Sequence, residues 1–249
     1  MILSISNLWW QFLLLSIGSY LIGNINFAVI ISKLKKQDIR KIGSGNPGTL
    51  NMSRNFGLKI GVLTLILDIL KGAVPTFIGW ILYKDCYFEF AMLPVETFSK
   101  VMCGFFAVLG HIFPVFMHFK GGKGIATTIG VFAVCNIVVA LISGVVAIIF
   151  ILITEIGAMG SFIATTPGAI ATCFSIYEKY IANQITSSKQ IIVTLMANLF
   201  VVFIILLTWY AHRQNIKRLL MGEEHPTNWL QMIKESLIKR KVKKINKKS

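Results

Sequence analysis

The chain has 249 residues, of which 55% are hydrophobic and only 14% are charged, whereas about 25% of residues are charged in soluble proteins. An ordinary soluble globule is therefore excluded. The net charge is +15, and the cations are clustered, with five between positions 33 and 41, eleven between 213 and 248, and none between 125 and 177. Cations beside apolar runs are typical of cytoplasmic loops that face anionic lipid head groups, and not of a nucleic-acid surface.

Apolar runs follow one another along the chain, and a helix needs about 20 apolar residues to cross a bilayer. Four runs meet this length on their own, at residues 8–31, 58–83, 101–119 and 191–211. A fifth run, 125–177, is too long for one helix and is predicted to hold three short spans, at 125–141, 143–156 and 162–177. The first run is longer than a signal-peptide core, so we expect it to be a retained span. The predicted fold class is all-α, a polytopic membrane protein with seven transmembrane helices.

The charges of the loops predict how these helices are oriented. Residues 32–57 and the tail after 211 are basic and are expected in the cytoplasm, whereas 84–99 is acidic and suits the outer side. The amino terminus is therefore predicted outside and the carboxyl terminus in the cytoplasm. The membrane-embedded part is expected to comprise residues 1–224, and 225–249 is expected to be a basic, interfacial cytoplasmic tail with an amphipathic helix at 229–244.

Three polar segments that contain glycine interrupt the apolar runs, and this topology places all of them on the cytoplasmic side. They lie at 43–54, 120–124 and 212–224, and a turn predicted at 157–161 joins them there. Together they bring guanidinium, ammonium, amide and hydroxyl groups to one membrane face. Such a convergence is typical of a site that binds phosphate.

The first polar segment begins with GSGNPG at position 43. Its glycines allow backbone N–H groups to converge on an anion, Ser44 and Asn46 add donors, and Arg54 can engage two phosphate oxygens at once. The string also matches the dinucleotide-binding pattern G-x-G-x-x-G, but no strand precedes it, which disfavours a Rossmann site. A tight cytosolic turn with incidental polar residues is the alternative.

The other two polar segments carry a cation and a histidine. The KGGKG string places Lys120 and Lys123 just before a helix, where N–H groups at the helix start and Lys123 can hold one phosphate. The alternative is a pair of lysines that only sets topology. Farther along, His212 and Asn215 share a helical face. His212 is a candidate to orient or deprotonate a substrate hydroxyl, and solvated groups on an exit helix are the alternative.

Other charged residues are expected to support the structure. Asp68 and Lys71 lie three residues apart within a predicted span, so a buried mutual pair is predicted. Glu223 and Glu224 are expected to hold loops together through Arg213 or Lys217. The four cysteines are scattered without metal-ligand or disulfide spacing, and no metal site is predicted.

Three strings carry a resemblance that covers the chain up to about position 224. They are SGNPGTLNMSR at 44–54, GHIFPVFMHFKGGKGIAT at 110–127 and HRQNIKRLLMGEE at 212–224. With these motifs the chain resembles the bacterial membrane-integral acyl-phosphate:glycerol-3-phosphate acyltransferase family. The resemblance implies transfer of a fatty acyl group from acyl phosphate to the sn-1 hydroxyl of glycerol-3-phosphate, giving lysophosphatidic acid and phosphate for phospholipid biosynthesis. It also implies seven spans, no cofactor and no metal, and an upstream enzyme that forms acyl phosphate.

The resemblance assigns roles to residues by position. The catalytic positions are Ser44, Arg54, Lys123, His212 and Asn215. The substrate-binding positions are Asn46, Gly48, Asn51, Lys120, Gly121, Gly122 and Ser161. Acyl phosphate and glycerol-3-phosphate are the expected partners, with membrane lipids around the protein and no nucleic acid. Since no Ser-His-Asp triad is evident, the departing phosphate or else His212 is expected to accept the hydroxyl proton.

The chain departs from the family pattern at one site position and in its tail. Where relatives often have GATN, this chain has Leu50 in place of a small polar residue, and its basic tail is longer than the family requires. Two alternative functions stay open. An organophosphate transporter is disfavoured because no internal repeat is evident, and Leu50 leaves open a catalytically idle relative.

Overall fold

The apolar runs form helices, because a backbone inside a bilayer must satisfy its own hydrogen bonds. The computed structural model describes residues 1–180, 188–224 and 226–245. The apolar helices of the bundle are α1 (Ile5–Asn24), α4 (Leu58–Leu82), α5 (Val95–Ile112), α6 (Ile125–Cys135), α7 (Ile137–Thr154), α8 (Gly157–Tyr180) and α9 (Ser188–Ala211). The remaining helices are α2 (Phe27–Leu34), η1 (Ile39–Lys41), α3 (Thr49–Phe56), η2 (Val115–Met117), α10 (Arg213–Leu220) and α11 (Trp229–Ile245). Strands β1 (Ile2–Leu3) and β2 (Tyr87–Phe88) form one short parallel pair of two residues each. All other elements of the described residues are helices, which confirms the all-α class.

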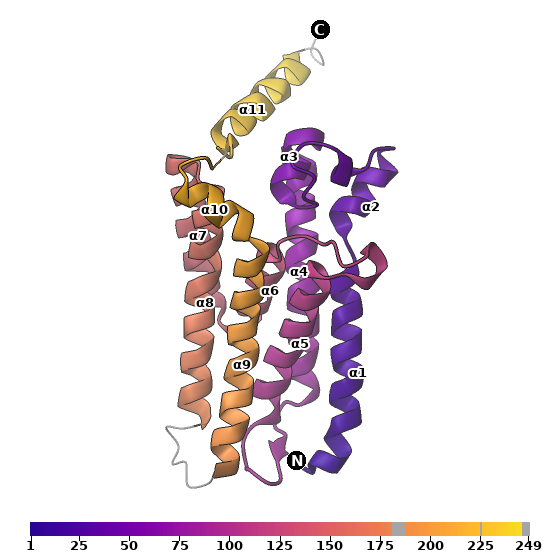
Figure 1. Cartoon of the computed structure of the whole chain (residues 1–249), viewed down its shortest axis with the longest axis vertical. Coiled ribbons are helices and arrows are strands. Elements are labelled where there is room, and N and C mark those ends of the chain that lie inside the picture. Colours follow the sequence, from indigo (N-terminus) through magenta and orange to yellow (C-terminus); the bar gives the residue numbers. More distant parts are fainter. Residues whose placement is uncertain (181–187, 225, 246–249) are drawn as a thin grey trace.

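Six helical segments among the described residues are long and apolar enough to cross a bilayer, where seven were predicted. The seventh apolar helix, α6, has 11 residues. At 1.5 Å per residue it is about 16 Å long, roughly half of the hydrocarbon core. Strand β1 and helix α11 lie at opposite ends of the bundle (Figure 1), in keeping with an odd number of passes. Seven complete crossings are not confirmed.

An asparagine inside an apolar run sets a helix boundary that the hydrophobic pattern did not reveal. The Asn136 side chain accepts a hydrogen bond from the Val139 N–H at 3.1 Å and so caps α7. The predicted spans 125–141 and 143–156 are therefore wrong, because α6 ends before Asn136 and Ser143 is buried within α7.

The other predicted spans match the structure to different degrees. The span predicted at 8–31 is broken in two, since the Asn26 side chain accepts from the Val29 N–H at 3.1 Å and starts α2. The spans predicted at 58–83 and 191–211 correspond closely to α4 and α9. The turn predicted at 157–161 is instead the first turn of α8, and the chain reverses at 155–156.

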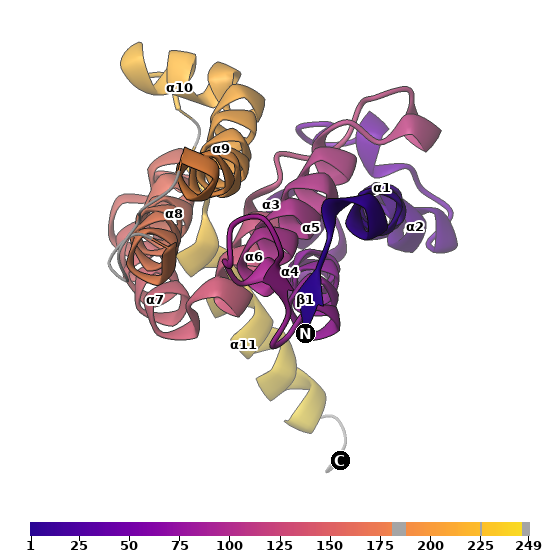
Figure 2. The ribbon, with the colours of Figure 1, turned by 90° about the horizontal axis from the view of Figure 1, so that it is seen from below.

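Helix α6 lies at the centre of the bundle, between a group that contains α1, α4 and α5 and a group that contains α7, α8 and α9 (Figure 2). Glycine makes its closest crossing possible, because a Cβ at Gly130 would lie 2.0 Å from the Ile69 carbonyl oxygen of α4. Small residues at such crossings let membrane helices approach closely. The start of α6, where the KGGKG loop enters, is also held against α4, because a Cβ at Gly72 of α4 would lie 2.0 Å from the Thr127 carbonyl oxygen.

The predicted pair between Asp68 and Lys71 is confirmed. The Lys71 Nζ lies 2.9 Å from Asp68 Oδ1, and both side chains are buried. Lys71 also donates to the Ile25 carbonyl oxygen at 2.7 Å, at the break between α1 and α2. A carbonyl left free by a helix break is thus satisfied by a neighbouring helix.

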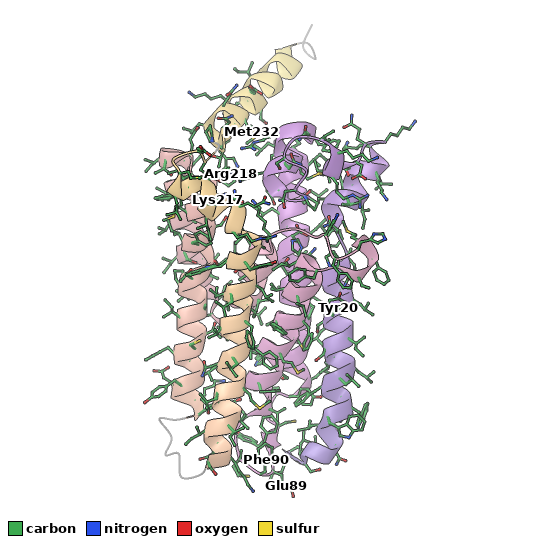
Figure 3. All side chains as sticks on the ribbon, viewed as in Figure 1. Tyr20, Glu89, Phe90, Lys217, Arg218 and Met232 are labelled. Carbon is green, nitrogen blue, oxygen red and sulfur yellow. The ribbon has the colours of Figure 1, made fainter. Side chains whose placement is uncertain are left out.

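The polar segments gather at one end of the bundle. Helices α2, α3 and α10 lie at the end that also carries α11 (Figure 1). Lys217 and Arg218 of α10 lie at that end, opposite Glu89 of the loop after α4 (Figure 3). The predicted convergence of distant polar segments at one end is confirmed, and this end is called the polar end below.

Candidate active site

The loop before α3 is folded around one asparagine. Asn51 is buried, and its Nδ2 donates to the carbonyl oxygens of Ile39 at 3.3 Å and Ile42 at 3.0 Å. Its Oδ1 accepts from the Ser44 N–H at 3.2 Å and from Asn55 Nδ2 at 3.0 Å. Asn51 therefore uses both ends of its amide to hold the loop.

The same loop brings small and polar groups to the start of α3. Gly43 and Gly45 have φ angles of +58° and +70°, a region that favours glycine. Gly48 is the N-cap of α3. Ser44 is exposed and Asn46 is half-buried beside this helix start. Free N–H groups at a helix start attract anions, so this loop can bind a phosphate group.

The KGGKG loop is pinned to the end of α5. The N–H of Gly121 donates to the Ile112 carbonyl oxygen at 3.1 Å, and the N–H of Gly122 donates to the His111 carbonyl oxygen at 3.2 Å. A Cβ at Gly122 would lie 2.3 Å from His111 Nε2, so only glycine fits. The loop leaves Lys120 exposed and Lys123 half-buried.

Lys123 is held by a residue far along the chain. Its Nζ donates to Asn215 Oδ1, and Asn215 Nδ2 donates to Glu224 Oε1 at 2.7 Å. Glu224 Oε2 also accepts from Arg218 Nε at 3.2 Å. We call Lys123, Asn215, Arg218 and Glu224 the lysine cluster. It joins the second and third polar segments through direct side-chain contacts.

The partner expected for Glu224 was wrong. The predicted partners were Arg213 and Lys217, but Glu224 pairs with Arg218. Arg213 instead lies over the Tyr210 ring, 4.3 Å from its centroid, an arrangement that suits a cation beside an aromatic residue at a membrane boundary. Sequence reasoning thus gave no separate role to Arg218, and it named Glu224 with the wrong partners.

Burial changes the protonation of two groups beside this cluster. Desolvation lowers the pKa of Lys123 to about 8, with Arg218 lowering it further and Glu224 acting in the opposite direction. Desolvation, with the charge of Lys123, lowers the pKa of His212 to about 4. At neutral pH the lysine is mainly protonated and the imidazole is neutral.

His212 follows α9 directly and is buried. Its Nδ1 lies 3.0 Å from the Thr208 carbonyl oxygen, so we assign the proton to Nδ1. Nε2 then carries the lone pair and can accept a hydrogen bond from a hydroxyl group. The ring packs edge-on against Phe162 of α8 at 5.6 Å between centroids.

Arg54 belongs to α3 and meets the chain after Glu224. Its Nη2 donates to the carbonyl oxygens of Pro226 at 2.8 Å and Thr227 at 3.3 Å. Ser161 of α8 is half-buried and donates to the Gly157 carbonyl oxygen at 2.9 Å. Within the described ranges, no side-chain contact joins Arg54 or Ser44 directly to Lys123. Glu224 belongs to the lysine cluster, and Pro226 and Thr227 contact Arg54.

The described residues contain no group of three or more His, Cys, Asp or Glu side chains that could hold a metal ion. The four cysteines are free thiols. The polar groups that do gather are cations, amides and helix N–H groups. This combination can bind and neutralise anions, and its neutral imidazole can orient a hydroxyl group.

The match with known proteins spans most of the chain. Residues 13–222 match the family model described as glycerol-3-phosphate acyltransferase. The chain belongs to the glycerol-3-phosphate acyltransferase family. It is 35% identical to the glycerol-3-phosphate acyltransferase of Mycoplasmopsis pulmonis, over 86% of this chain and 92% of that protein. It is 40% identical to glycerol-3-phosphate acyltransferase 2 of Bacillus anthracis, over 83% of this chain and 94% of that protein.

Solved structures support the same family. The glycerol 3-phosphate form of PlsY, an integral membrane glycerol 3-phosphate acyltransferase, has a TM-score of 0.67 and 35% identity, covering 90% of this chain and 98% of that chain. The lysophosphatidic acid form of PlsY has a TM-score of 0.66 and 34% identity. The predicted family is confirmed, and the chain is a multi-pass membrane protein of an acyltransferase family.

Proposed function

We propose that this protein transfers a fatty acyl group from acyl phosphate to the sn-1 hydroxyl of glycerol-3-phosphate, giving lysophosphatidic acid and inorganic phosphate. The observation that carries the proposal is the position of Lys123, a half-buried cation that Asn215 holds next to the neutral imidazole of His212. The family and the named ligands of PlsY support glycerol-3-phosphate as the acceptor. The choice of acyl phosphate as donor and of the sn-1 position rests on the motifs.

Charge neutralisation is the main catalytic task in this scheme. Both substrates are anions, and negative charge grows on the carbonyl oxygen and on the departing phosphate as the bond to the new ester oxygen forms. Lys123 supplies positive charge in a partly dehydrated site, where it stabilises the transition state more than it would in water. Arg54, which is exposed, adds a second cation that can bind phosphate. Holding the hydroxyl against the acyl carbon lowers the activation free energy further, because the two reacting groups are already placed for bond formation.

The other predicted positions have binding or positioning roles in this proposal. Ser44 and Asn46 offer side-chain donors near the start of α3, which Gly48 caps, and Asn51 shapes the loop that carries them. Lys120 offers a cation to the phosphate, whereas Gly121 and Gly122 shape their loop, because their N–H groups already donate to carbonyl oxygens of α5. Ser161 can reach the substrate only by giving up its hydrogen bond to the Gly157 carbonyl oxygen. Asn215 keeps Lys123 in place.

The proton of the acceptor hydroxyl goes to the departing phosphate. The hydroxyl oxygen bonds to the acyl carbon, the bond between that carbon and the phosphate oxygen breaks, and the phosphate leaves with the proton. His212 has a pKa of about 4, which makes it a weak base at neutral pH. Its Nε2 instead accepts a hydrogen bond from the hydroxyl and orients it.

The site is proposed to face the cytoplasm of the cell membrane, with the amino terminus outside. The basic loop 32–57 and the basic tail after 211 both belong to the polar end, and positive loops stay inside. Because acyl phosphate is already activated, a reaction that forms it must precede this step. The tail helix α11 matches the helix predicted there, and its interfacial location stays a proposal; residues 225 and 246–249 of the predicted tail lie outside the described residues.

A comparison of acyl donors tests the proposal. Purified protein in detergent is given glycerol-3-phosphate with acyl phosphate, acyl-CoA or acyl carrier protein, and both phosphate and lysophosphatidic acid are measured. With glycerol-3-phosphate present, we expect only acyl phosphate, of the three donors, to give equal amounts of phosphate and lysophosphatidic acid. Without glycerol-3-phosphate, we expect neither product. Product from another donor only, or no product from any donor, would overturn the proposed reaction.

A further inference from the structure

The chain after Glu224 returns to the loop that carries Arg54. The family match ends at residue 222, so this return lies beyond the part of the chain that the family defines. Arg54 Nη2 donates to two carbonyl oxygens of the returning segment, at Pro226 and Thr227. These acceptors belong to the main chain, so their position depends on how the segment is anchored.

Thr227 anchors the returning segment against the turn between α7 and α8. Its N–H donates to the Glu155 carbonyl oxygen at 3.0 Å, and the residue is buried. A Cβ added at Gly157 would lie 2.8 Å from the Thr227 methyl group and 3.5 Å from Leu50 Cδ1. The methyl group thus sits in a space that Gly157 leaves open, beside α3.

The hydroxyl of Thr227 does not contribute to the anchor. Its Oγ1 is buried and has no hydrogen-bond partner among the residues that the structure describes. Shape and main-chain bonding hold the segment, and an aliphatic residue of the same shape satisfies both requirements. Replacing an unpaired buried hydroxyl by a methyl group removes a desolvation cost.

The contact orients Arg54 and leaves it able to bind phosphate. Both hydrogen bonds to the returning segment use Nη2, whereas a guanidinium carries five N–H donors on three nitrogens. Neutral carbonyl acceptors cannot cancel its charge. A flexible arginine fixed in this way loses less side-chain entropy when it binds a phosphate.

We propose that Thr227 is a positioning residue that holds Arg54 ready for the phosphate of glycerol-3-phosphate, acting through the carbonyl oxygens of Pro226 and Thr227. The inference rests on the proposed function for the identity of the ligand. It gives the first residues beyond the family match a role in substrate binding. Leu50, which departs from the family pattern, lies near the same glycine, since a Cβ at Gly157 would be 3.5 Å from Leu50 Cδ1.

Three variants of the full-length protein test this role. Thr227→Gly removes the methyl group and loosens the main chain, and Gly157→Ala pushes the methyl group away. Both should raise KM and Kd for glycerol-3-phosphate about tenfold, and kcat/KM should fall at least tenfold because Arg54 belongs to the site. Thr227→Val keeps the shape and should restore wild-type KM. Lys234→Ala, on the exposed surface of α11, is the control for a change in the tail.

Coupling with Arg54 separates positioning from a general structural effect. In an Arg54→Lys background, Thr227→Gly should change Kd by less than about twofold, because the group that it positions is absent. Binding is measured by calorimetry with glycerol-3-phosphate, and thermal unfolding in detergent checks the fold. If either variant fails to fold, the other decides.

Some outcomes overturn the inference. A normal Kd in both Thr227→Gly and Gly157→Ala, or the same tenfold loss in the Arg54→Lys background, would contradict it. Failure of the proposed function gives a different pattern, in which the wild-type protein does not bind glycerol-3-phosphate at all.

Discussion

The loop before α3 and the lysine cluster are built in opposite ways. Asn51 holds its loop through partners within 12 residues in the sequence. Lys123 and Asn215, in contrast, lie 92 residues apart. The loop keeps its own shape, whereas the cluster forms only when the two halves of the bundle pack. The comparison predicts that changes in the loop cost stability and that changes in the cluster cost activity.

The largest effect is expected from removing the cation of the cluster. Lys123→Ala should lower kcat/KM about 1,000-fold, because a preorganised charge in a dehydrated site contributes about that much to catalysis. Stability should change little, since burying this cation already carries a desolvation cost. Phosphate release and thermal unfolding measure the two effects. A large fall in unfolding temperature together with full activity would contradict the comparison.

A change in the loop should have the opposite balance. Asn51→Ala removes four hydrogen bonds of a buried amide and should cost about 3 kcal/mol of folding stability. KM for glycerol-3-phosphate should rise about 30-fold as the loop loses its shape. Thermal unfolding and steady-state kinetics test this, with exposed Lys59→Ala as the control. Unchanged stability would show that Asn51 does not hold the loop.

The pKa of Lys123 predicts how activity depends on pH. The lysine is charged below its pKa of about 8 and neutral above it, so kcat/KM should be level near pH 7 and fall up to tenfold per unit well above pH 8. Lys123→Arg stays charged over this range and should remove the fall, whatever its absolute rate. A fall with the same midpoint in this variant would assign the titration to another group.

A smaller effect is expected at His212, if it orients the hydroxyl and is not the base. His212→Gln keeps a hydrogen-bonding group and should lower kcat about tenfold. The pH profile between 5 and 8 should keep its shape, because the pKa of His212 lies near 4. A loss of 1,000-fold or more would make His212 the proton acceptor.

The smallest effect is expected at the departure from the family pattern. Leu50 contacts the region of Gly157 at the edge of the site, so Leu50→Thr should change KM for glycerol-3-phosphate by at most about threefold. Parallel kinetics of the variant and the wild-type protein measure this. An inactive wild type that Leu50→Thr makes active would support the idle-relative alternative.

Charge and hydropathy predicted the gathering of polar segments at one end, because apolar runs mark the spans and the excess of lysine and arginine marks the loops that share a side. They did not predict the breaks before Asn26 and Asn136, where one side chain replaces a helix hydrogen bond inside an apolar run. Nor did they reveal that Glu224 pairs with Arg218. Such contacts depend on how helices that are distant in the sequence pack. The sequence offers several neighbouring cations as partners for Glu224 and does not show which one pairs with it.

The most direct test of the account is the side from which two exposed site positions can be labelled. Ser44→Cys and Lys120→Cys, each in a cysteine-free background, are treated with a membrane-impermeant maleimide in right-side-out and inverted vesicles. The account predicts that both react only in inverted vesicles and that glycerol-3-phosphate slows both reactions. Labelling of the two positions from opposite sides would contradict a single anion-binding site at the cytoplasmic face.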